Sequence, residues 1–521
     1  MRIFKVFVLL RRSCFAVQRK GLVIIMGTQI IFWTYIAICV VVGIYSSIKT
    51  NETKTSANFT TANSSQGTLV VGCSLFAACV SGTAVVGVTN NYWAIGLAAV
   101  TYSIVRVLLT LGMGAFVADK IYRIRTVIVN ELFGEIFQPH DSALFGIVSS
   151  LILIGVAGAS IRAAALMLPS LFPVLGEHFI LCLLLVTILC GSLSTAGGIR
   201  ATNATNTLHA VCILLGTFLV ATIGIHQNGG LFAAIHSMPN VRGAHWFDFG
   251  GDTIMNFVGS FLGVIVYSYV GQTEWNVSRS AKTPHSARNA FFFSGIMQFI
   301  LAVLLVGIGI VAVLNVPDLG TSSAMAAAAY SISPLLAGLA IAAIFACSVS
   351  TAQGMYIAQS TITLGWVKNY YARKQKKLPE KVQFRIMQGM IVLLSLIAFV
   401  FCWFATDLIG FLTSLLSIYT PFSILLILMF FSPKVLRKST CTWVFGFAMS
   451  FMLLFLFIPA INRFFQAAAY PLLIGTVLGI VAALLTDKRP IDTAGLFRTD
   501  EEIQADLEQE NIRASKREEI S

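Results

Sequence analysis

The chain has 521 residues, of which 57% are hydrophobic and only 11% are charged, and its mean hydropathy is +0.84. A soluble domain carries roughly 25% charged residues, so this composition excludes a soluble globular protein. The net charge of +13 could suggest nucleic acid, but the Lys and Arg residues gather in short loops between apolar stretches. We therefore expect no nucleic-acid partner.

Apolar stretches long enough to cross a bilayer recur from one end of the chain to the other. They predict an all-α polytopic membrane protein with about thirteen transmembrane helices. The expected spans are residues 26–47, 68–89, 93–117, 143–168, 175–196, 204–225, 252–271, 285–313, 334–364, 385–405, 408–431, 441–460 and 469–486.

The two ends of the chain differ from this transmembrane domain, which we place at residues 26–486. Residues 1–25 are rich in Arg and Lys, and Met26 begins a cleaner first span, so we interpret them as an extension or a mis-assigned start. Residues 487–521 are charged and polar, and we expect a short cytoplasmic tail, either solvated or helical.

The basic loops predict the orientation of the spans. They follow the third, seventh, ninth and eleventh spans and so alternate consistently to one side, which is the cytoplasmic side of a plasma or bacterial inner membrane. The first span then begins outside, and the tail lies in the cytoplasm. The polar segment before the second span lies in the cytoplasm as well, and we expect a flexible connector there. It contains the unglycosylated sequons at Asn51, Asn58 and Asn63.

Two spans are rich in small and hydroxyl residues. The second reads GTLVVGCSLFAACVSGTAVVG (67–87); a helix that breaks in mid-membrane frees carbonyls that can coordinate Na⁺, whereas close helix packing is the structural alternative. The ninth holds Ser348, Ser350 and Thr351 together. Their hydroxyls can supply hard oxygen ligands without net charge, or can bond back to their own helix.

Two arginines, Arg106 and Arg162, fall inside spans. An ionisable residue there costs about 2.5–3.5 kcal/mol and indicates a functional site; snorkelling and pairing within the bundle are the alternatives. We expect no acid at the same depth, because Asp407 falls at an outer turn and Glu274 at the cytoplasmic end of its span. A substrate carboxylate would neutralise the charge, and arginine binds carboxylates bidentately.

Four segments in order resemble motifs of the sodium:solute symporter family, which includes bacterial proline, sugar and sialic-acid symporters. They are SLFAACVSGTAVVG (74–87), GGIRATNATNTLHA (197–210), GQTEWNVSRSAKTPHSAR (271–288) and FACSVSTAQG (345–354). The resemblance runs from about residue 26 to 440. It implies two inverted five-helix repeats, roughly 68–226 and 252–431, with a broken first helix in each.

The resemblance also implies a sodium site between the second and ninth spans. Its ligands would be the carbonyls of Ala77, Val80 and Cys347 and the hydroxyls of Ser350 and Thr351. The chain departs from the family pattern in the fifth helix of the fold, where Asn206 replaces an Asp that some members use for a second sodium ion. Cys347 takes the place of the serine that would complete it. We therefore expect one Na⁺ at most.

For the substrate, the resemblance implies a cavity lined by residues of several spans. Arg106 falls on a position that contacts sugar in a family member, but the acidic sugar-binding position falls on Ser103, which argues against a sugar site. Arg162 lies about one turn from an Arg of sialic-acid members, and Tyr269 matches an inner-gate tyrosine. The same cavity is expected to take Thr83, Gln298 and Thr413.

These residues predict a secondary active transporter that couples Na⁺ to a small solute by alternating access, the solute being an organic anion such as a sialic acid or another carboxylate. A Na⁺-independent facilitator or exchanger is the alternative that Asn206 and Cys347 motivate; a membrane sensor is a third. We find no nucleotide-binding motif and no catalytic cluster, so we expect no enzyme. The expected partners are the solute, Na⁺ and the lipid bilayer, and nothing indicates an oligomer.

Overall fold

The computed structural model describes residues 27–48, 54–242, 244–248, 259, 267–319, 323–403, 416–461, 467–506 and 508. These residues are almost entirely helical, and their β pairing is limited to isolated bridges. Nine helices among them are long and apolar enough to cross a membrane. The prediction of an all-α polytopic membrane protein is confirmed. The count of thirteen stays a prediction, because most of the span expected at 252–271 and the first third of the span expected at 408–431 lie outside the described residues, as does the segment 1–25.

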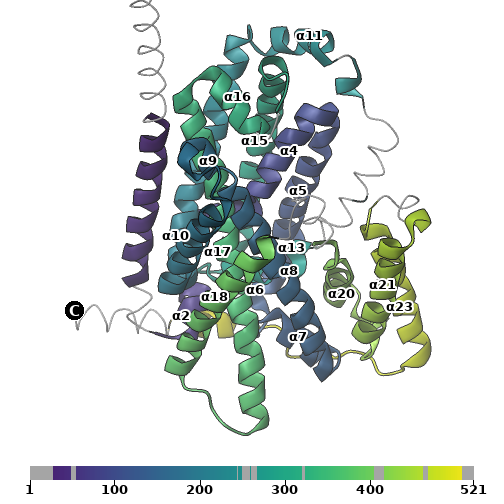
Figure 1. Cartoon of the computed structure of the whole chain (residues 1–521). Helices are drawn as coiled ribbons and strands as arrows, with labels where there is room; N and C mark the ends of the chain where they lie inside the picture. Colours follow the sequence, from purple (N-terminus) through teal and green to yellow (C-terminus); the bar gives the residue numbers. More distant parts are fainter. Residues whose placement is uncertain are drawn as a thin grey trace, which may run out of the picture.

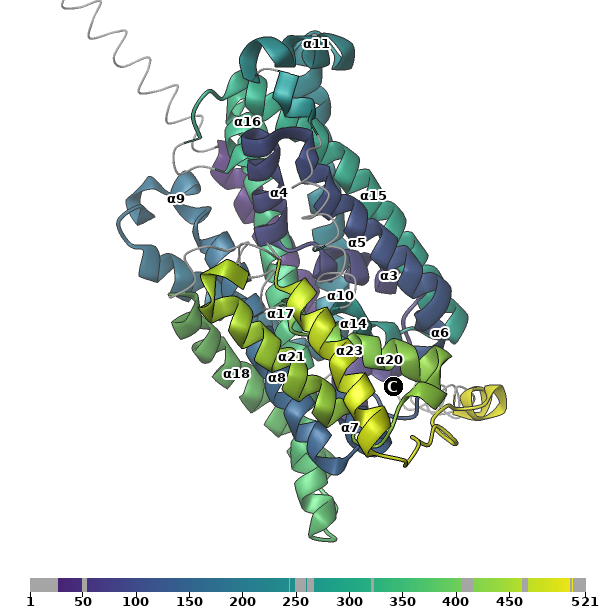
Figure 2. The same cartoon turned by 90° about the vertical axis from the view of Figure 1, so that its right-hand side faces the viewer.

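The helices form an elongated bundle (Figures 1 and 2). A first helix, Gly27–Ile48, lies along its edge. The labelled helices are α2 (Ser56–Thr61), α3 (Thr68–Cys79), α4 (Gly82–Ile95), α5 (Val100–Gly112), α6 (Ala118–Arg123), α7 (Val129–Ile136), α8 (Pro139–Ala165), α9 (Leu168–Leu171), α10 (Phe179–Gln227), α11 (Leu231–Arg242), α13 (Tyr267–Val270), α14 (Gln272–Arg279), α15 (Pro284–Asn315), α16 (Ala324–Ile332), α17 (Pro334–Arg373), α18 (Glu380–Cys402), α20 (Thr420–Phe431), α21 (Thr440–Phe457) and α23 (Ala469–Thr486).

The centre of the bundle is α17, which packs against α10, α8 and α18. In its most apolar window 89% of the residues are buried, against 28% for Gly27–Ile48 at the edge. Small residues dominate the buried part of α17, and they let neighbouring backbones approach closely. The structure therefore places the Ser/Thr segment of the ninth expected span in the interior, away from lipid.

Two expected spans, 175–196 and 204–225, belong to one kinked element, α10. The kink is at Gly198, whose φ of 56° lies in the left-handed region. A Cβ on Gly198 would stand 2.7 Å from the carbonyl oxygen of Phe59, so glycine is required both by the backbone conformation and by the close approach of α2.

The polar segment before α3 differs from the flexible connector expected there. Residues Ser56–Thr61 form α2, and Phe59 is fully buried with its ring 5.3 Å from that of Phe384 in an edge-on contact. The Ser64 hydroxyl donates a hydrogen bond of 2.8 Å to the Arg279 carbonyl. A buried aromatic side chain and hydrogen bonds from Ser64 and Ser56 therefore hold this polar segment against the bundle.

The tail after α23 packs on the loop that follows α6. Arg125 N donates to the Leu496 carbonyl at 3.1 Å, and Arg498 N donates to the Arg123 carbonyl at 2.7 Å. Two ion pairs flank these bonds, Arg123–Asp500 at 2.6 Å and Arg125–Glu502 at 2.9 Å. Hydrogen bonding to the Thr499 amide, aided by Arg125, lowers the pKa of the Glu502 carboxyl. Residues 500–506 of this segment are helical.

Candidate functional site

The second expected span is broken near its middle. α3 ends at Cys79, Val80 leaves the helical region with φ −95° and ψ 88°, and α4 restarts at Gly82. Ser81 caps the new helix, since its hydroxyl accepts a hydrogen bond of 3.0 Å from Ala84 N. The break frees the last carbonyls of α3 from helical bonding.

The start of α4 lies directly on α17. A Cβ on Gly82 would stand 1.9 Å from the Ser348 hydroxyl and 2.9 Å from the Ile344 carbonyl oxygen, so any larger residue would push α4 and α17 apart. The small residues of this span therefore serve both purposes that the sequence left open: they allow close packing, and they accompany a broken helix.

Opposite the end of α3, two hydroxyls of α17 meet a group of carbonyls. Ser350 Oγ lies 2.8 Å from the Ala77 carbonyl oxygen and 2.9 Å from that of Cys347. Thr351 Oγ1 lies 3.3 Å from the Ala78 carbonyl oxygen and 3.0 Å from that of Cys347. Each hydroxyl has one hydrogen and can donate it to only one of its two neighbours at a time. The two hydroxyl hydrogens thus face three carbonyls, and both hydroxyl oxygens keep lone pairs available to a cation.

These five oxygens form what we call the oxygen cluster: the carbonyls of Ala77, Ala78 and Cys347 and the hydroxyls of Ser350 and Thr351. Four of the five residues expected at a sodium site contribute to it. The fifth, Val80, lies at the break itself, and Ala78 was not anticipated. In the described part of the chain no group of three or more His, Cys, Asp or Glu residues could hold a metal, so a cation in this cluster would depend on neutral oxygens.

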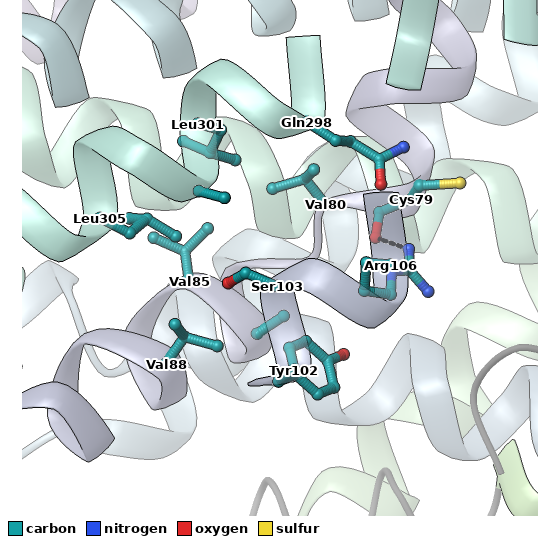
Figure 3. Close-up of a pocket in the computed structure, with 12 residues that line it drawn as sticks. Cys79, Val80, Val85, Val88, Tyr102, Ser103, Arg106, Gln298, Leu301 and Leu305 are labelled. Carbon is teal, nitrogen blue, oxygen red and sulfur yellow. Dashed lines mark hydrogen bonds between the residues drawn. The ribbon is translucent and has the colours of Figure 1, made fainter. Parts of the chain in front are cut away.

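A small pocket with a cavity volume of about 40 Å³ opens on the other side of the break, between α4, α5 and α15. Its labelled side chains divide into two ends (Figure 3). Arg106, Gln298 and Cys79 gather at one end, and Val85, Val88 and Leu305 at the other, with Ser103 between them. Of the residues predicted to line a substrate cavity, Arg106, Ser103 and Gln298 are brought together here.

Arg106 is 8% exposed, and its guanidinium donates a hydrogen bond to the Cys79 carbonyl, the last of α3. The carboxamide of Gln298 is hydrogen-bonded to the Thr110 hydroxyl one turn further along α5, with 3.0 Å between Nε2 and Oγ1. The arginine therefore ties the helix break to the polar end of the pocket, and it does not reach towards lipid. Snorkelling is not the explanation for this buried cation.

The other predicted substrate residues lie elsewhere. Arg162 on α8 donates a hydrogen bond of 2.9 Å to the Cys402 carbonyl at the end of α18, and its guanidinium stands over the Phe179 ring at 5.1 Å. Thr83 donates to the Ala159 carbonyl of α8 at 3.3 Å. A Cβ on Gly112 of α5 would lie 3.5 Å from the Tyr269 hydroxyl. Thr413 is outside the described residues.

Glu274 is the residue whose position the sequence argument missed. It was expected at the cytoplasmic end of its span, but the chain breaks at Gly271, between α13 and α14, so Glu274 falls in the first turn of a new helix. It is 2% exposed, and the Cys79 thiol lies 3.9 Å from its carboxylate. The glycine at 271 was the available signal, because a glycine in an apolar span can end a helix.

Asn206, the departure in the fifth helix of the fold, belongs to a neutral hydrogen-bonded chain between α10 and α3. Its Nδ2 donates to Ser74 Oγ at 2.9 Å, and Ser74 donates to Asn203 Oδ1 at 2.6 Å. All three side chains are fully buried. The amide is thus accommodated by hydrogen bonds, without any ionised partner among the described residues.

The fold contains two membrane helices that are each interrupted once, at Val80 and at Gly271. Such interrupted helices define the class of protein as a membrane transporter. The sequence profile of the sodium:solute symporter family matches residues 59–440, and the chain belongs to that family. The resemblance inferred from the four motifs is therefore confirmed, and the family is one of transporters, not of enzymes.

Among curated proteins, the human and bovine sodium-coupled monocarboxylate transporters 2 are each 24% identical to this chain, over 65% and 68% of it. A sodium/glucose cotransporter of Vibrio parahaemolyticus is 23% identical over 55% of the chain. The matched regions cover 57%, 60% and 55% of these relatives, so the chain spans less than two thirds of their length.

Among solved structures, a Na⁺-coupled sialic acid symporter in a substrate-bound outward-open state superposes with a TM-score of 0.73 at 15% identity, over 89% of this chain and 99% of that one. A transporter of the nucleobase-cation-symport-1 family in a closed conformation gives a TM-score of 0.55, also at 15% identity, over 86% of this chain and 97% of that one. These similarities support the fold of two repeats with broken helices.

Proposed function

We propose that this protein is a Na⁺-coupled symporter of a small organic anion and that it works by alternating access. The observation that carries the proposal is the buried guanidinium of Arg106 at the polar end of a pocket, one helix break away from a cluster of neutral oxygens. A carboxylate on the solute would bind the guanidinium, and Na⁺ would bind the oxygen cluster.

The sodium part of the proposal is supported by the composition of the oxygen cluster. Na⁺ is a hard cation and takes oxygen ligands, and broken helices in transporters supply carbonyls for it. We assign one Na⁺ to Ala77, Ala78, Cys347, Ser350 and Thr351, and we keep Val80 as a further candidate at the break. A second ion in the region of Asn206 is not proposed, because that side chain carries no charge.

The anion part is supported by burial and by chemistry. A buried guanidinium favours a ligand that supplies charge and planar hydrogen-bond acceptors, and carboxylates supply both. Three of the similar proteins are named for carboxylate solutes: the two monocarboxylate transporters and the sialic acid symporter. We propose Arg106, Ser103 and Gln298 as the principal solute contacts. Arg162, Thr83, Tyr269 and Thr413 are retained as residues of the path that opens in other states.

The repeats and the membrane orientation are proposed as the sequence predicts them. We propose that residues 68–226 and 252–431 are the two inverted repeats, and that the basic loops face the cytoplasm of a cell whose plasma or inner membrane holds the protein. The first helix then begins outside, and the tail that docks on residues 122–126 lies inside.

The first test is a thermal-shift screen of purified protein with organic anions, pyruvate and N-acetylneuraminate first among them, in Na⁺ and in K⁺ buffers. We expect a stabilising anion whose effect is larger in Na⁺. In Arg106→Ala the affinity for that anion should fall at least about 30-fold, because truncating one partner of a buried charged pair costs about 2 kcal/mol or more.

Arg162→Ala is the matched control, since it removes the other intramembrane arginine and leaves the pocket intact. It should retain most of the anion affinity. If Arg106→Ala binds the anion as the wild type does, the assignment of the carboxylate site is wrong.

A facilitator or exchanger on the same fold is the second candidate. The neutral Asn206 chain favours it, since a site that lacks an ionised ligand holds Na⁺ less tightly. It predicts that anion binding and transport are the same in Na⁺ and K⁺ buffers.

A further inference from the structure

Glu274 is a buried acid that the proposed function does not use. Glu274 lies on α14, and its side chain is next to Cys79, the last residue of α3. Arg106 on α5 donates a hydrogen bond to the carbonyl of the same cysteine. The thiol of Cys79 is within electrostatic reach of both charges. Cys79 therefore contacts both side chains at the break next to the pocket and the oxygen cluster.

We propose that Glu274 is the fixed counter-charge that couples anion binding to a cation in this protein. The inference rests on the proposed function and adds a residue to it. Glu274 does not touch the solute; it acts on the solute through the net charge of the site, so it is a coupling residue.

The argument is a count of charges in a buried site. Arg106 and Glu274 are 8% and 2% exposed, and among the described residues they are the two charged side chains next to Cys79. With both groups ionised, the pair carries no net charge. A solute carboxylate that enters the pocket makes the site negative, and an uncompensated charge is costly in a buried environment.

A cation in the oxygen cluster removes that cost. The Ala77 carbonyl, which accepts from Ser350, precedes Cys79 by two residues, or about 3 Å along the helix axis. Na⁺ in the oxygen cluster and the carboxylate beside Arg106 would thus be close enough to attract each other across the break. Each would therefore raise the affinity of the protein for the other. One Na⁺ and one monovalent anion restore the neutrality of the empty site.

Without the negative charge of Glu274, the net charge of the site is different. Arg106 and the carboxylate would then already be neutral together, and Na⁺ would add a positive charge with nothing to balance it. The dependence of anion binding on Na⁺ therefore comes, on this account, from a negative charge that is fixed in the protein and is not part of the oxygen cluster.

The test uses the full-length purified protein and the anion that gives the largest shift in the screen of pyruvate, N-acetylneuraminate and related anions. Its dissociation constant is measured in Na⁺ and in K⁺ buffers for the wild type and for Glu274→Gln, which keeps the size and hydrogen-bonding capacity of the side chain. For the wild type we expect affinity to be about 5- to 150-fold higher in Na⁺, the usual range for coupled sites.

For Glu274→Gln we expect the ratio between the two buffers to fall below about threefold, because the affinity in K⁺ rises. That gain separates coupling from a structural role, since a damaged fold weakens binding in both buffers. Glu135→Gln, on an exposed acid of α7, is the control and should keep the wild-type ratio. Glu274→Asp should keep most of it, because the charge remains.

Two results would overturn the inference. One is an unchanged ratio in Glu274→Gln; the other is a loss of affinity in both buffers, including the case in which the variant does not fold while Glu274→Asp does. If no anion binds the wild type at all, the proposed function itself fails and the inference falls with it.

Discussion

Ser350 and Thr351 show how two ordinary side chains differ from their usual role in a membrane helix. A hydroxyl in such a helix commonly donates to a carbonyl one turn earlier, and each of these does so with Cys347. Each also faces a carbonyl of α3 that the helix break has freed. The α3 carbonyls of Ala77 and Ala78 add oxygens from a second helix, and this combination makes the two hydroxyls a candidate ion site.

At this scale we predict the outcome of the double substitution Ser350→Ala and Thr351→Ala. The thermal stabilisation by Na⁺ should disappear, because two of the five oxygens are lost, while anion affinity in K⁺ buffer should stay within about threefold of the wild type. Titration of the melting temperature with NaCl, at constant ionic strength, measures the first effect.

Ser360→Ala is the control for this pair. Ser360 lies on the same helix and is equally buried, but within the described part of the chain its hydroxyl bonds only to the Ile357 carbonyl of its own helix. It should leave Na⁺ stabilisation unchanged. A double variant that still responds to Na⁺ would place the ion elsewhere.

Helix breaks decide how far the sequence could predict this protein. The break at Val80 was foreseeable, because small residues crowd the second span and Ser81 has the chemistry of a helix cap. The resemblance predicted a broken first helix in the second repeat but not its position at Gly271, and the kink at Gly198 was not recognised. Hydropathy counts residues along the chain and does not report where a helix changes direction. Because the position of the break at Gly271 was unknown, Glu274 was expected at the end of a span. It lies next to Cys79, whose carbonyl accepts a hydrogen bond from Arg106.

The contact between α4 and α17 gives a prediction at the scale of the element. Gly82→Ala should lower the melting temperature, at a cost of about 1–3 kcal/mol, because the new methyl group would meet the Ser348 hydroxyl and a backbone oxygen of α17. The same displacement should weaken Na⁺ binding, since Ser350 lies half a turn beyond Ser348 on α17.

Gly389→Ala on α18 is the matched control. A Cβ there would meet nothing within 4 Å, and alanine is a better helix former than glycine by about 0.8–1 kcal/mol. This variant should be as stable as the wild type or more so. Equal stability of Gly82→Ala and Gly389→Ala would contradict the close packing of α4 on α17.

The whole molecule combines features that the sequence predicted well with others that needed the fold. Hydropathy and basic loops predicted a polytopic membrane protein, because the bilayer imposes those patterns on any chain that spans it. Of the seven residues that the resemblance placed in one substrate cavity, Arg106, Ser103 and Gln298 line one pocket. Their role as solute contacts stays a prediction. The docking of the tail and the folding of Ser56–Thr61 were not predicted, because a few buried side chains in polar segments determine them.

The most direct test of this account is uptake of the screened anion into proteoliposomes with an inward Na⁺ gradient, compared with K⁺ in its place. The account predicts that the anion accumulates above its external concentration only when the Na⁺ gradient is present, and that Arg106→Ala abolishes this uptake. Equal uptake in Na⁺ and K⁺, without accumulation, would contradict Na⁺-coupled transport.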